Sequence, residues 1–335
     1  MSRSTFATYL HPHTTLTSKA RNQIDFVGFS LPYWDSVRHE LAQALQNFPS
    51  LPPRMAEFDD YLRVHTSTYL QQLHLMAAEI PPEPMPRLSG ECTGLEYALP
   101  GYQYGLGGMM EAIDQMRAGV LERAYCFSLG GHHAHTDWGH GYCLLNPLAA
   151  AARYAQEQGF ERILIVDWDI HHGDGTQAIF AHDPTVYCIS IHSAADLYMG
   201  FTAGLEHGST VAGQRTGHCN LPLLSARFEA SFWEELGLGG EFYRARESLS
   251  VFRDALAQLP WVPDLICIFS GYDGHREDGG KGITEWGNDE FRQLTRAVLE
   301  VARRADCPIL SVHGGGYKGP ITVAAALSHV EELAR

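Results

Sequence analysis

The sequence lacks the apolar runs that a membrane protein needs. No segment of the 335 residues reaches the roughly 18 uninterrupted apolar residues of a membrane-spanning helix. Met1 to Thr8 also contains no apolar core of the length that a signal peptide requires. We therefore expect a cytoplasmic protein that has no membrane partner.

Paired cysteines are absent as well. The seven cysteines are scattered along the chain without a C-x-x-C pair. Four of them lie in or beside apolar runs that resemble strands: Cys126, Cys188, Cys267 and Cys307. This pattern predicts buried free thiols, and it excludes both a disulfide framework and a zinc knuckle.

Basic residues are too few for a protein that binds nucleic acid. Lysine and arginine number 24 against 39 aspartates and glutamates, which gives a formal net charge of −15. Such a surface repels phosphate backbones and is compatible with the attraction of small cationic molecules. A homo-oligomer is compatible with this composition too, which does not specify an oligomeric state.

Repeats, low-complexity tracts and linkers are also missing, and the length and the hydrophobic content of 45% favour one large α/β domain over residues 1–335. A short strand followed by a loop is expected over Thr5–His13. Helices are expected after an N-cap at Asp35, over Glu57–Ile80, over Tyr102–Ala118 and between Asn146-Pro147 and Gly159. Gly107 and Gly108 are expected to mark close packing.

Five short apolar runs, most of them separated by helix candidates, predict a mainly parallel sheet that helices cover on both faces. The runs are Ala124–Leu129, Ile163–Ile170, Val186–Ile191, Leu265–Ser270 and Pro308–Val312. Each is followed by polar residues: GGHHAH, DWDIHHGDG, HSAADLYMG, GYDGHRED and HGGGYKG. Ligands of such sheets bind beyond the carboxyl ends of the strands. We therefore expect the active site there, with the connection from His192 to Leu221 as an active-site loop.

The run ILIVDWDIHHGDGTQ carries the clearest chemical signal. Asp167, Asp169 and His171 are two residues apart, so they point to one side of an extended strand. Most D-x-D strings are turns or caps, but these acids end a buried run, where uncompensated charge is costly. Asp273, after LICIFSGY, would complete an Asp, His, Asp set with an open position for water, as in zinc hydrolases.

His132 and His133 follow two glycines after a predicted strand, which makes them candidates for the general acid and base. Each needs a carboxylate that fixes its tautomer, and Asp167 and Asp174 are available for this. Tyr317 follows three glycines. It is either an aromatic residue at the rim or a phenol that donates to a developing oxyanion.

The ordered motifs GGHHAHTDWGHGYCLLN, VDWDIHHGDGTQ, SGYDGH and HGGGY resemble those of the histone deacetylase family, including its bacterial acetylpolyamine amidohydrolase branch. The similarity runs from about Arg54, where RVHTSTYL resembles an early family segment, to the C-terminus. It implies an arginase-like α/β fold with a mostly parallel, eight-stranded sheet and one catalytic zinc ion.

The resemblance also assigns roles. Asp169, His171 and Asp273 match the zinc ligands. His133 matches the general base and acid and His132 its electrostatic partner, with Asp167 behind His132 and Asp174 behind His133. Tyr317 matches the tyrosine that polarises the substrate carbonyl.

Gly141 and Tyr142 match a wall of the acyl-lysine channel. A structural potassium ion is implied at Asp167, Asp169, His171, Ser190 and Ile191, and a second at Phe180, Asp183 and Val186.

The chain departs from the family where substrate enters. Asn146 is followed by Pro147 instead of aspartate, and a PGTG loop is not recognisable in SAADLYMGFTAG. The motifs therefore do not decide which residue forms the second aromatic wall of the channel, and the two candidates are Tyr198 and Phe201.

The function implied is removal of an acetyl group from a small cationic amine such as an acetylpolyamine, and acetyl-lysine in peptides or proteins is the alternative. Glu277, Asp278 and Glu91 could attract the cation at the mouth, although solvated loop charge is the more common role of such acids. A two-manganese ureohydrolase is disfavoured because Gly173 and His275 occupy positions where it needs acids. A non-catalytic ligand binder is the remaining alternative.

Overall fold

The computed structural model describes residues 4–14, 32–194, 210–211, 214–215, 217–226, 235 and 242–335. The chain divides into two compact units, one formed by Met1–Phe160 with Leu310–His313, the other by Glu161–Ile309 with Gly314–Arg335. The organisation as a single domain over residues 1–335 stays a prediction.

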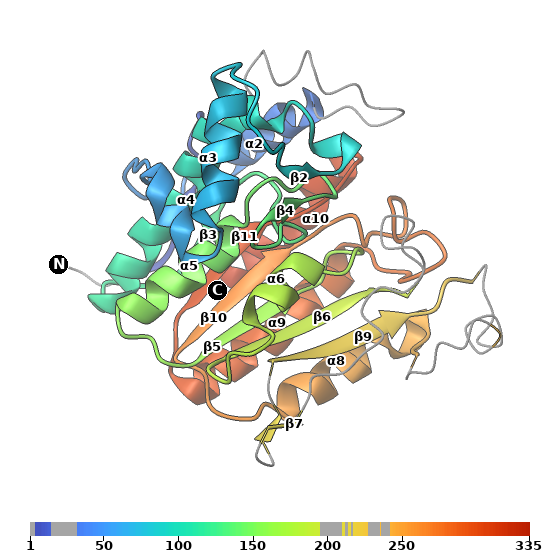
Figure 1. Ribbon diagram of the computed structural model, residues 1–335. Helices are drawn as coiled ribbons and strands as arrows, with labels where there is room; N and C mark the ends of the chain where they lie inside the picture. Colours follow the sequence, from blue (N-terminus) through green and yellow to red (C-terminus); the bar gives the residue numbers. More distant parts are fainter. Residues whose placement is uncertain are drawn as a thin grey trace. The chain divides into compact units, whose positions relative to one another are not determined.

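The first unit contains three strands of the main sheet, in the order β1 (Ser4–Tyr9), β3 (Leu121–Cys126) and β11 (Ile309–His313). β1 and β3 pair in parallel. The helices are α2 (Pro32–Ala44), α3 (Ser67–Ala77), α4 (Leu99–Arg117) and α5 (Pro147–Glu157), with 3₁₀ turns η1 (Phe58–Arg63), η2 (Gly90–Cys92) and η3 (Leu95–Ala98). A small parallel pair joins β2 (Arg87–Leu88) to β4 (Trp138–Gly139). Figure 1 labels the four helices and, of the strands, β2, β3, β4 and β11.

Two helix predictions for this unit need correction. Asp35 does not cap the predicted helix, because α2 already begins at Pro32 and Asp35 lies in its first turn. Proline suits the first turn, where its missing N–H is not needed. The predicted helix over Glu57–Ile80 is interrupted after η1, and α3 starts anew where the Thr66 side chain accepts a hydrogen bond from Tyr69 N.

Other local predictions for this unit are confirmed. The Asn146 side chain accepts from Ala149 N at 3.0 Å, which caps α5 as expected. Added Cβ atoms on Gly107 and Gly108 would collide with the Arg54 backbone and with the Tyr9 ring, so both glycines do mark close packing.

The second unit contains four parallel strands in the order β10 (Leu265–Ser270), β5 (Ile163–Asp167), β6 (Val186–Ser193) and β9 (Gly217–Leu223). The prediction for β10 is confirmed, and β5 ends three residues earlier than expected. β9 corrects the reading of His192–Leu221 as one loop. Its apolar Cys219 and Leu221 alternate with the polar His218 and Asn220, which is the period of a strand, although Asn220 is buried as well.

The helices of this unit are α6 (Asp174–Phe180), α8 (Ser248–Ala257), α9 (Asn288–Ala305) and α10 (Gly319–Leu333), with the 3₁₀ turn η4 (Ala245–Glu247). β7 (Thr210–Val211) and β8 (Gln214–Arg215) form a small antiparallel pair. α6 and α8 contact β6 and β9, while α9 packs against both α8 and α10. Figure 1 shows these helices against the strands of the unit.

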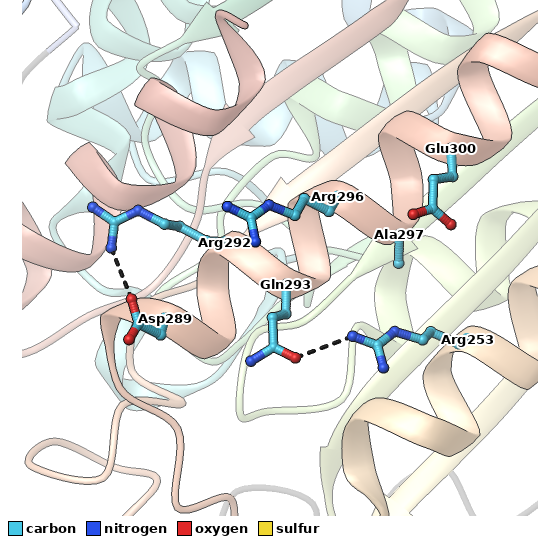
Figure 2. A pocket seen from close by; sticks show the side chains of 7 residues that line it. All are labelled: Arg253, Asp289, Arg292, Gln293, Arg296, Ala297 and Glu300. Carbon is cyan, nitrogen blue, oxygen red and sulfur yellow. Dashed lines mark hydrogen bonds and ion pairs between the residues drawn. The ribbon is translucent and has the colours of Figure 1, made fainter.

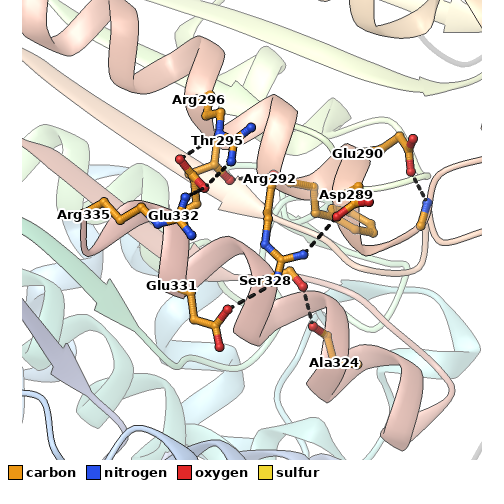
Figure 3. A network of polar contacts seen from close by, with 12 residues as sticks. Asp289, Glu290, Arg292, Thr295, Arg296, Ala324, Ser328, Glu331, Glu332 and Arg335 are labelled. Atoms are coloured by element: carbon orange, nitrogen blue, oxygen red, sulfur yellow. Dashed lines mark hydrogen bonds and ion pairs between the residues drawn. The ribbon is translucent and has the colours of Figure 1, made fainter.

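Ion pairs connect α9 to α10 (Figure 3). Arg292 of α9 lies 3.2 Å from Glu331, and Arg296 lies 2.8 Å from Glu332. Glu331 is exposed and Glu332 is buried, but the Arg296 side chain of the second pair is 49% exposed, and pairs that are open to solvent contribute little each. The buried apolar side chains of α9, among them Phe291, Leu294 and Val298, are therefore the main source of its packing energy.

Seven strands thus belong to the main, largely parallel sheet within the described residues, one fewer than the eight expected. The cysteines are free thiols, as predicted, and all but the half-buried Cys307 are buried. Among the described helices, none combines the length and the apolarity needed to cross a membrane.

Candidate metal centre and active site

The candidate metal ligands follow the carboxyl end of β5. Ile163 to Val166 are at most 1% exposed and lie between β10 and β6, so the strand delivers Asp167 to the end of a buried ladder. Asp167 then accepts a hydrogen bond from Asp169 N at 2.9 Å. Asp169, two residues beyond the end of the strand, is only 1% exposed.

Asp169, His171 and Asp273 come together. Their ligand atoms all lie within 4.8 Å of one another. His171 Nδ1 lies 3.1 Å from Asp169 Oδ1 and 3.0 Å from Asp273 Oδ2. Asp273 Oδ1 accepts from Ile170 N at 3.0 Å, which fixes that carboxylate. The three predicted ligands therefore do come together from two strand ends, and their role as metal ligands stays a prediction.

The electrostatics of this group fit a bound cation. Burial raises the pKa of Asp273 well above its usual value, and the neighbouring Asp169 carboxylate raises it further. Two carboxylates buried within a few ångströms of each other are both ionised only when a positive charge lies beside them. A divalent ion provides it, and an oxygen, nitrogen, oxygen donor set suits zinc.

A glycine loop packs against the two carboxylates. Gly315 N donates to Asp169 Oδ2 at 2.8 Å. A Cβ on Gly315 would lie 2.6 Å from that oxygen and 2.9 Å from Asp273 Oδ2, so a side chain is not accommodated here. The loop leads to Tyr317, whose ring stands nearly perpendicular to that of His171, with the centroids 5.9 Å apart. The phenol therefore belongs to the same region as the three candidate ligands.

The histidine pair belongs to the first unit. His132 and His133 are 5% and 3% exposed, and their rings are 4.0 Å apart. Gly131 precedes them where a Cβ would collide with Pro147, and Gly141 packs directly on the His133 ring. Gly141, predicted as part of the channel wall, is thus a neighbour of His133, and its positive φ of 56° suits glycine.

His140 is a residue that the motifs did not single out. Its ring lies 5.0 Å from that of His133 and stacks on Trp138 at 4.1 Å. Arg87 covers the same tryptophan at 4.3 Å. The spacing of aromatic residues in HTDWGHGY was the available signal for this stack.

The three acids expected near the mouth have other roles or none. Glu91 accepts from Gly141 N at 2.9 Å. Burial would raise the pKa of Glu91, but hydrogen bonds from Ser89 and from backbone N–H groups lower it overall. Asp278 accepts from Tyr317 N and Lys318 N. Glu277 is exposed to solvent, as ordinary loop charges are.

Asp174 begins α6 and is 8% exposed. It belongs to the second unit, as Asp167 does, whereas His132 and His133 belong to the first. The predicted pairing of each histidine with a carboxylate therefore stays a prediction. Tyr142 is half-buried and has a positive φ of 61°. Tyr198 and Phe201 lie outside the described residues.

The residues expected to bind potassium are arranged along two neighbouring strands and one turn. Asp167 lies opposite Ser190 in the register of β5 and β6, and Ile191 is the next residue. Asp183 N donates to Phe180 O at 2.9 Å, and Val186 N donates to Asp183 O at 3.3 Å. Both potassium sites stay predictions.

A hollow of about 490 Å³ is lined by residues of α8 and α9 (Figure 2). Arg253 there donates to Gln293 at 3.1 Å, and Arg292 pairs with Asp289. The lining carries charges of both signs and contains none of the predicted site residues. We therefore do not assign it to the active site.

The comparison with known families decides the membership of the chain. Residues 33–333 match the histone deacetylase domain. The chain belongs to the histone deacetylase family. This confirms the resemblance inferred from the motifs, and relatives bear the names of amidohydrolases and deacetylases.

Similar proteins include a histone deacetylase-like amidohydrolase of Pseudomonas aeruginosa, 29% identical over 85% of this chain and 70% of that protein. A probable deacetylase of Archaeoglobus fulgidus is also 29% identical, over 84% of this chain and 73% of that protein. Polyamine deacetylase HDAC10 of Rattus norvegicus is 29% identical over 62% of this chain but only 34% of its own length. The HDA15 HD domain superposes with a TM-score of 0.75 over 99% of this chain and 90% of that one. At 22% identity this last likeness shows the fold alone.

Proposed function

We propose that the protein is a zinc-dependent deacetylase that hydrolyses the amide bond of an N-acetylated amine. The observation that carries the proposal is the convergence of Asp169, His171 and Asp273 in a chain of the histone deacetylase family. These three residues would hold the zinc ion and leave a coordination position open. When bound, the ion would supply Lewis-acid polarisation of the water and of the substrate carbonyl.

The proton transfers are assigned to the histidines. His133 would take a proton from the attacking water and later give it to the amine nitrogen as the C–N bond breaks. His132 would stabilise the charge that develops on His133. Asp167 and Asp174 would fix the tautomers of His132 and His133 respectively. The products are acetate and the free amine.

Tyr317 would stabilise the negative charge that develops on the carbonyl oxygen. Its ring lies against His171, and its main chain follows the glycine that contacts Asp169. A phenol in this position would donate its O–H to the oxygen as the carbonyl carbon becomes tetrahedral.

For the substrate we propose a small cationic acetylated amine of the acetylpolyamine class. The support is the net charge of −15 and the polyamine deacetylase among the relatives. Glu91 and Asp278 no longer support it, because backbone N–H groups occupy their carboxylates. The second candidate is acetyl-lysine in peptides or proteins, which the family name and the Pseudomonas aeruginosa relative support.

Two other functions fit the site less well. An arginase-type ureohydrolase needs a second metal ion, but Gly173 and His275 stand where its bridging acids would be. A non-catalytic binder would not need the candidate ligands together with Tyr317, and the chain retains all of them. Bound potassium, a cytoplasmic location, a homo-oligomer and the absence of a nucleic-acid partner remain part of the proposal.

The test measures amine release by zinc-loaded protein from N8-acetylspermidine, acetylputrescine and an acetyl-lysine peptide. We expect the highest kcat/KM on an acetylpolyamine, loss of turnover with a chelator, and recovery when zinc is added back. No release from any of the three substrates would refute the deacetylase. Preference for the peptide would refute only the substrate assignment.

A further inference from the structure

The glycine segment before Tyr317 is fixed against the candidate metal ligands. Gly314 N donates to Ser270 O at 2.9 Å, and Tyr272 N donates to Gly315 O at 2.7 Å. Gly315 N donates to Asp169 Oδ2 at 2.8 Å. The main chain at Gly314 and Gly315 therefore has anchors on both sides.

Gly316 separates these anchors from the tyrosine. Its φ is +150°, a conformation that side-chain-bearing residues rarely adopt, and a Cβ there would lie 2.5 Å from Thr322 Oγ1. A glycine has the widest backbone freedom of any residue. Small rotations at this position would move the phenol by a large amount, so the position of Tyr317 requires an anchor beyond Gly316.

Asp278 provides an anchor at that place. Its Oδ2 accepts from Tyr317 N at 2.8 Å and from Lys318 N at 2.9 Å. Lys318 Nζ in turn donates to the backbone oxygen of Glu277. One carboxylate oxygen thus holds two consecutive N–H groups, immediately before α10 begins at Gly319.

The anchor itself is tied to the turn that carries a candidate metal ligand. Asp278 N donates to His275 O at 2.8 Å, and Gly280 N donates to Asp273 O at 2.7 Å. Asp278 therefore lies on the same compact turn as Asp273. It connects the backbone of that turn to the backbone of Tyr317.

We propose that Asp278 is a positioning residue, which holds the phenol of Tyr317 where it reaches the carbonyl of a substrate bound at Asp169, His171 and Asp273. The inference rests on the proposed function, because it acts through the role given there to Tyr317. Asp278 itself touches main-chain N–H groups, so its contribution is to geometry.

A purely structural role for Asp278 makes a different prediction. An acid beside the first turn of a helix stabilises that helix through its dipole. If Asp278 did no more than start α10, its loss would lower thermal stability and would reduce kcat by the same factor whether or not the Tyr317 hydroxyl is present.

A double-mutant cycle with Tyr317→Phe separates the two roles. In the wild-type background, Asp278→Ala should lower kcat about 10- to 100-fold with a much smaller effect on KM, which is the size expected when a catalytic group is misplaced. In the Tyr317→Phe background the same change should lower kcat less than about twofold, since no hydroxyl remains to misplace.

Asp278→Asn keeps an acceptor oxygen and should recover part of the kcat that is lost in Asp278→Ala. Glu277→Gln is the matched control and should retain kcat, because its exposed carboxylate is not an anchor.

Hydrogen exchange supplies a readout that does not depend on activity. The Tyr317 and Lys318 amides should exchange faster in Asp278→Ala and stay protected in Glu277→Gln. In Asp278→Ala, the fold-change in zinc affinity should be smaller than the fold-change in the exchange rate of these amides. Equal kcat losses in the two backgrounds, or unchanged exchange at these amides, would overturn the inference. If the wild type hydrolyses no acetylated amine, the proposed function fails, and the exchange experiment still decides whether Asp278 holds Tyr317.

Discussion

Gly315→Ala is the most direct test of the candidate metal site. Gly315 N donates to Asp169 Oδ2, and an added Cβ would lie 2.6 Å from this oxygen and 2.9 Å from Asp273 Oδ2. The substitution adds one methyl group and changes no candidate ligand. Its effect on zinc binding therefore depends on the geometry described above.

The expected magnitude follows from these two distances. To reach an ordinary contact of about 3.4 Å, the oxygens would have to retreat by about 0.8 and 0.5 Å. Metal sites tolerate deviations of about 0.2 Å in ligand distance. Changes around metal ligands typically cost about 10- to 100-fold in affinity. We expect a loss of zinc affinity in this range, accompanied by about 1–3 kcal/mol of destabilisation from overpacking.

The assay is zinc binding by competition with a chromophoric chelator, together with thermal unfolding of the metal-free protein. Gly90→Ala serves as the control, because a Cβ at Gly90 meets no atom within 4 Å. We expect the control to bind zinc like the wild type. If Gly315→Ala also binds zinc with the affinity of the wild type, then Asp169 and Asp273 do not hold zinc in this arrangement.

Three further predictions concern the phenol, a buried histidine and helix packing. Tyr317→Phe should keep zinc affinity and lower kcat by ~10²–10³, the usual value of one oxyanion donor, and unchanged turnover would remove Tyr317 from the mechanism. Burial lowers the pKa of His65 to about 4. Its imidazole gains a proton near pH 6.5 only after unfolding, so unfolding free energy should fall from about pH 6.5 towards 4 by up to about 3 kcal/mol. Urea titrations at several pH values should show this, and a slope unchanged in His65→Gln would contradict it. Gly108→Ala should lower the free energy of unfolding by ~1–3 kcal/mol, because the added Cβ collides with the Tyr9 ring. A melting temperature equal to that of Gly90→Ala would exclude this packing argument.

Local patterns were sufficient to predict which three side chains come together at the candidate metal site. Asp169 and His171 could be placed on one side from their spacing, and Asp273 was expected because it follows another apolar strand run. The rule that parallel strands end at one edge accounts for the convergence, but the strand geometry does not, because β5 ends at Asp167 and both Asp169 and His171 lie beyond it. The family match over residues 33–333 supports the same motifs.

Features that depend on tertiary contacts could not be read in this way. Asp278 was considered for substrate attraction, but its carboxylate binds N–H groups that lie 39 and 40 residues further along the chain. Nothing in GHREDGG indicates that partner. The segment of β9 lies in a glycine-containing stretch, and it pairs as a strand with β6, which the local sequence does not indicate. Where α2 begins was missed because an acid in the first turn resembles an N-cap.

The buried thiols have a practical consequence for spectroscopy. Burial raises the pKa of Cys92 and of Cys307 to about 12, and it also raises those of Cys126 and Cys267. Only the thiolate reacts rapidly with maleimides. A cysteine introduced at Val262, where the side chain is 61% exposed, would therefore be labelled with a fluorophore or spin label, while these native thiols stay unlabelled and need not be replaced.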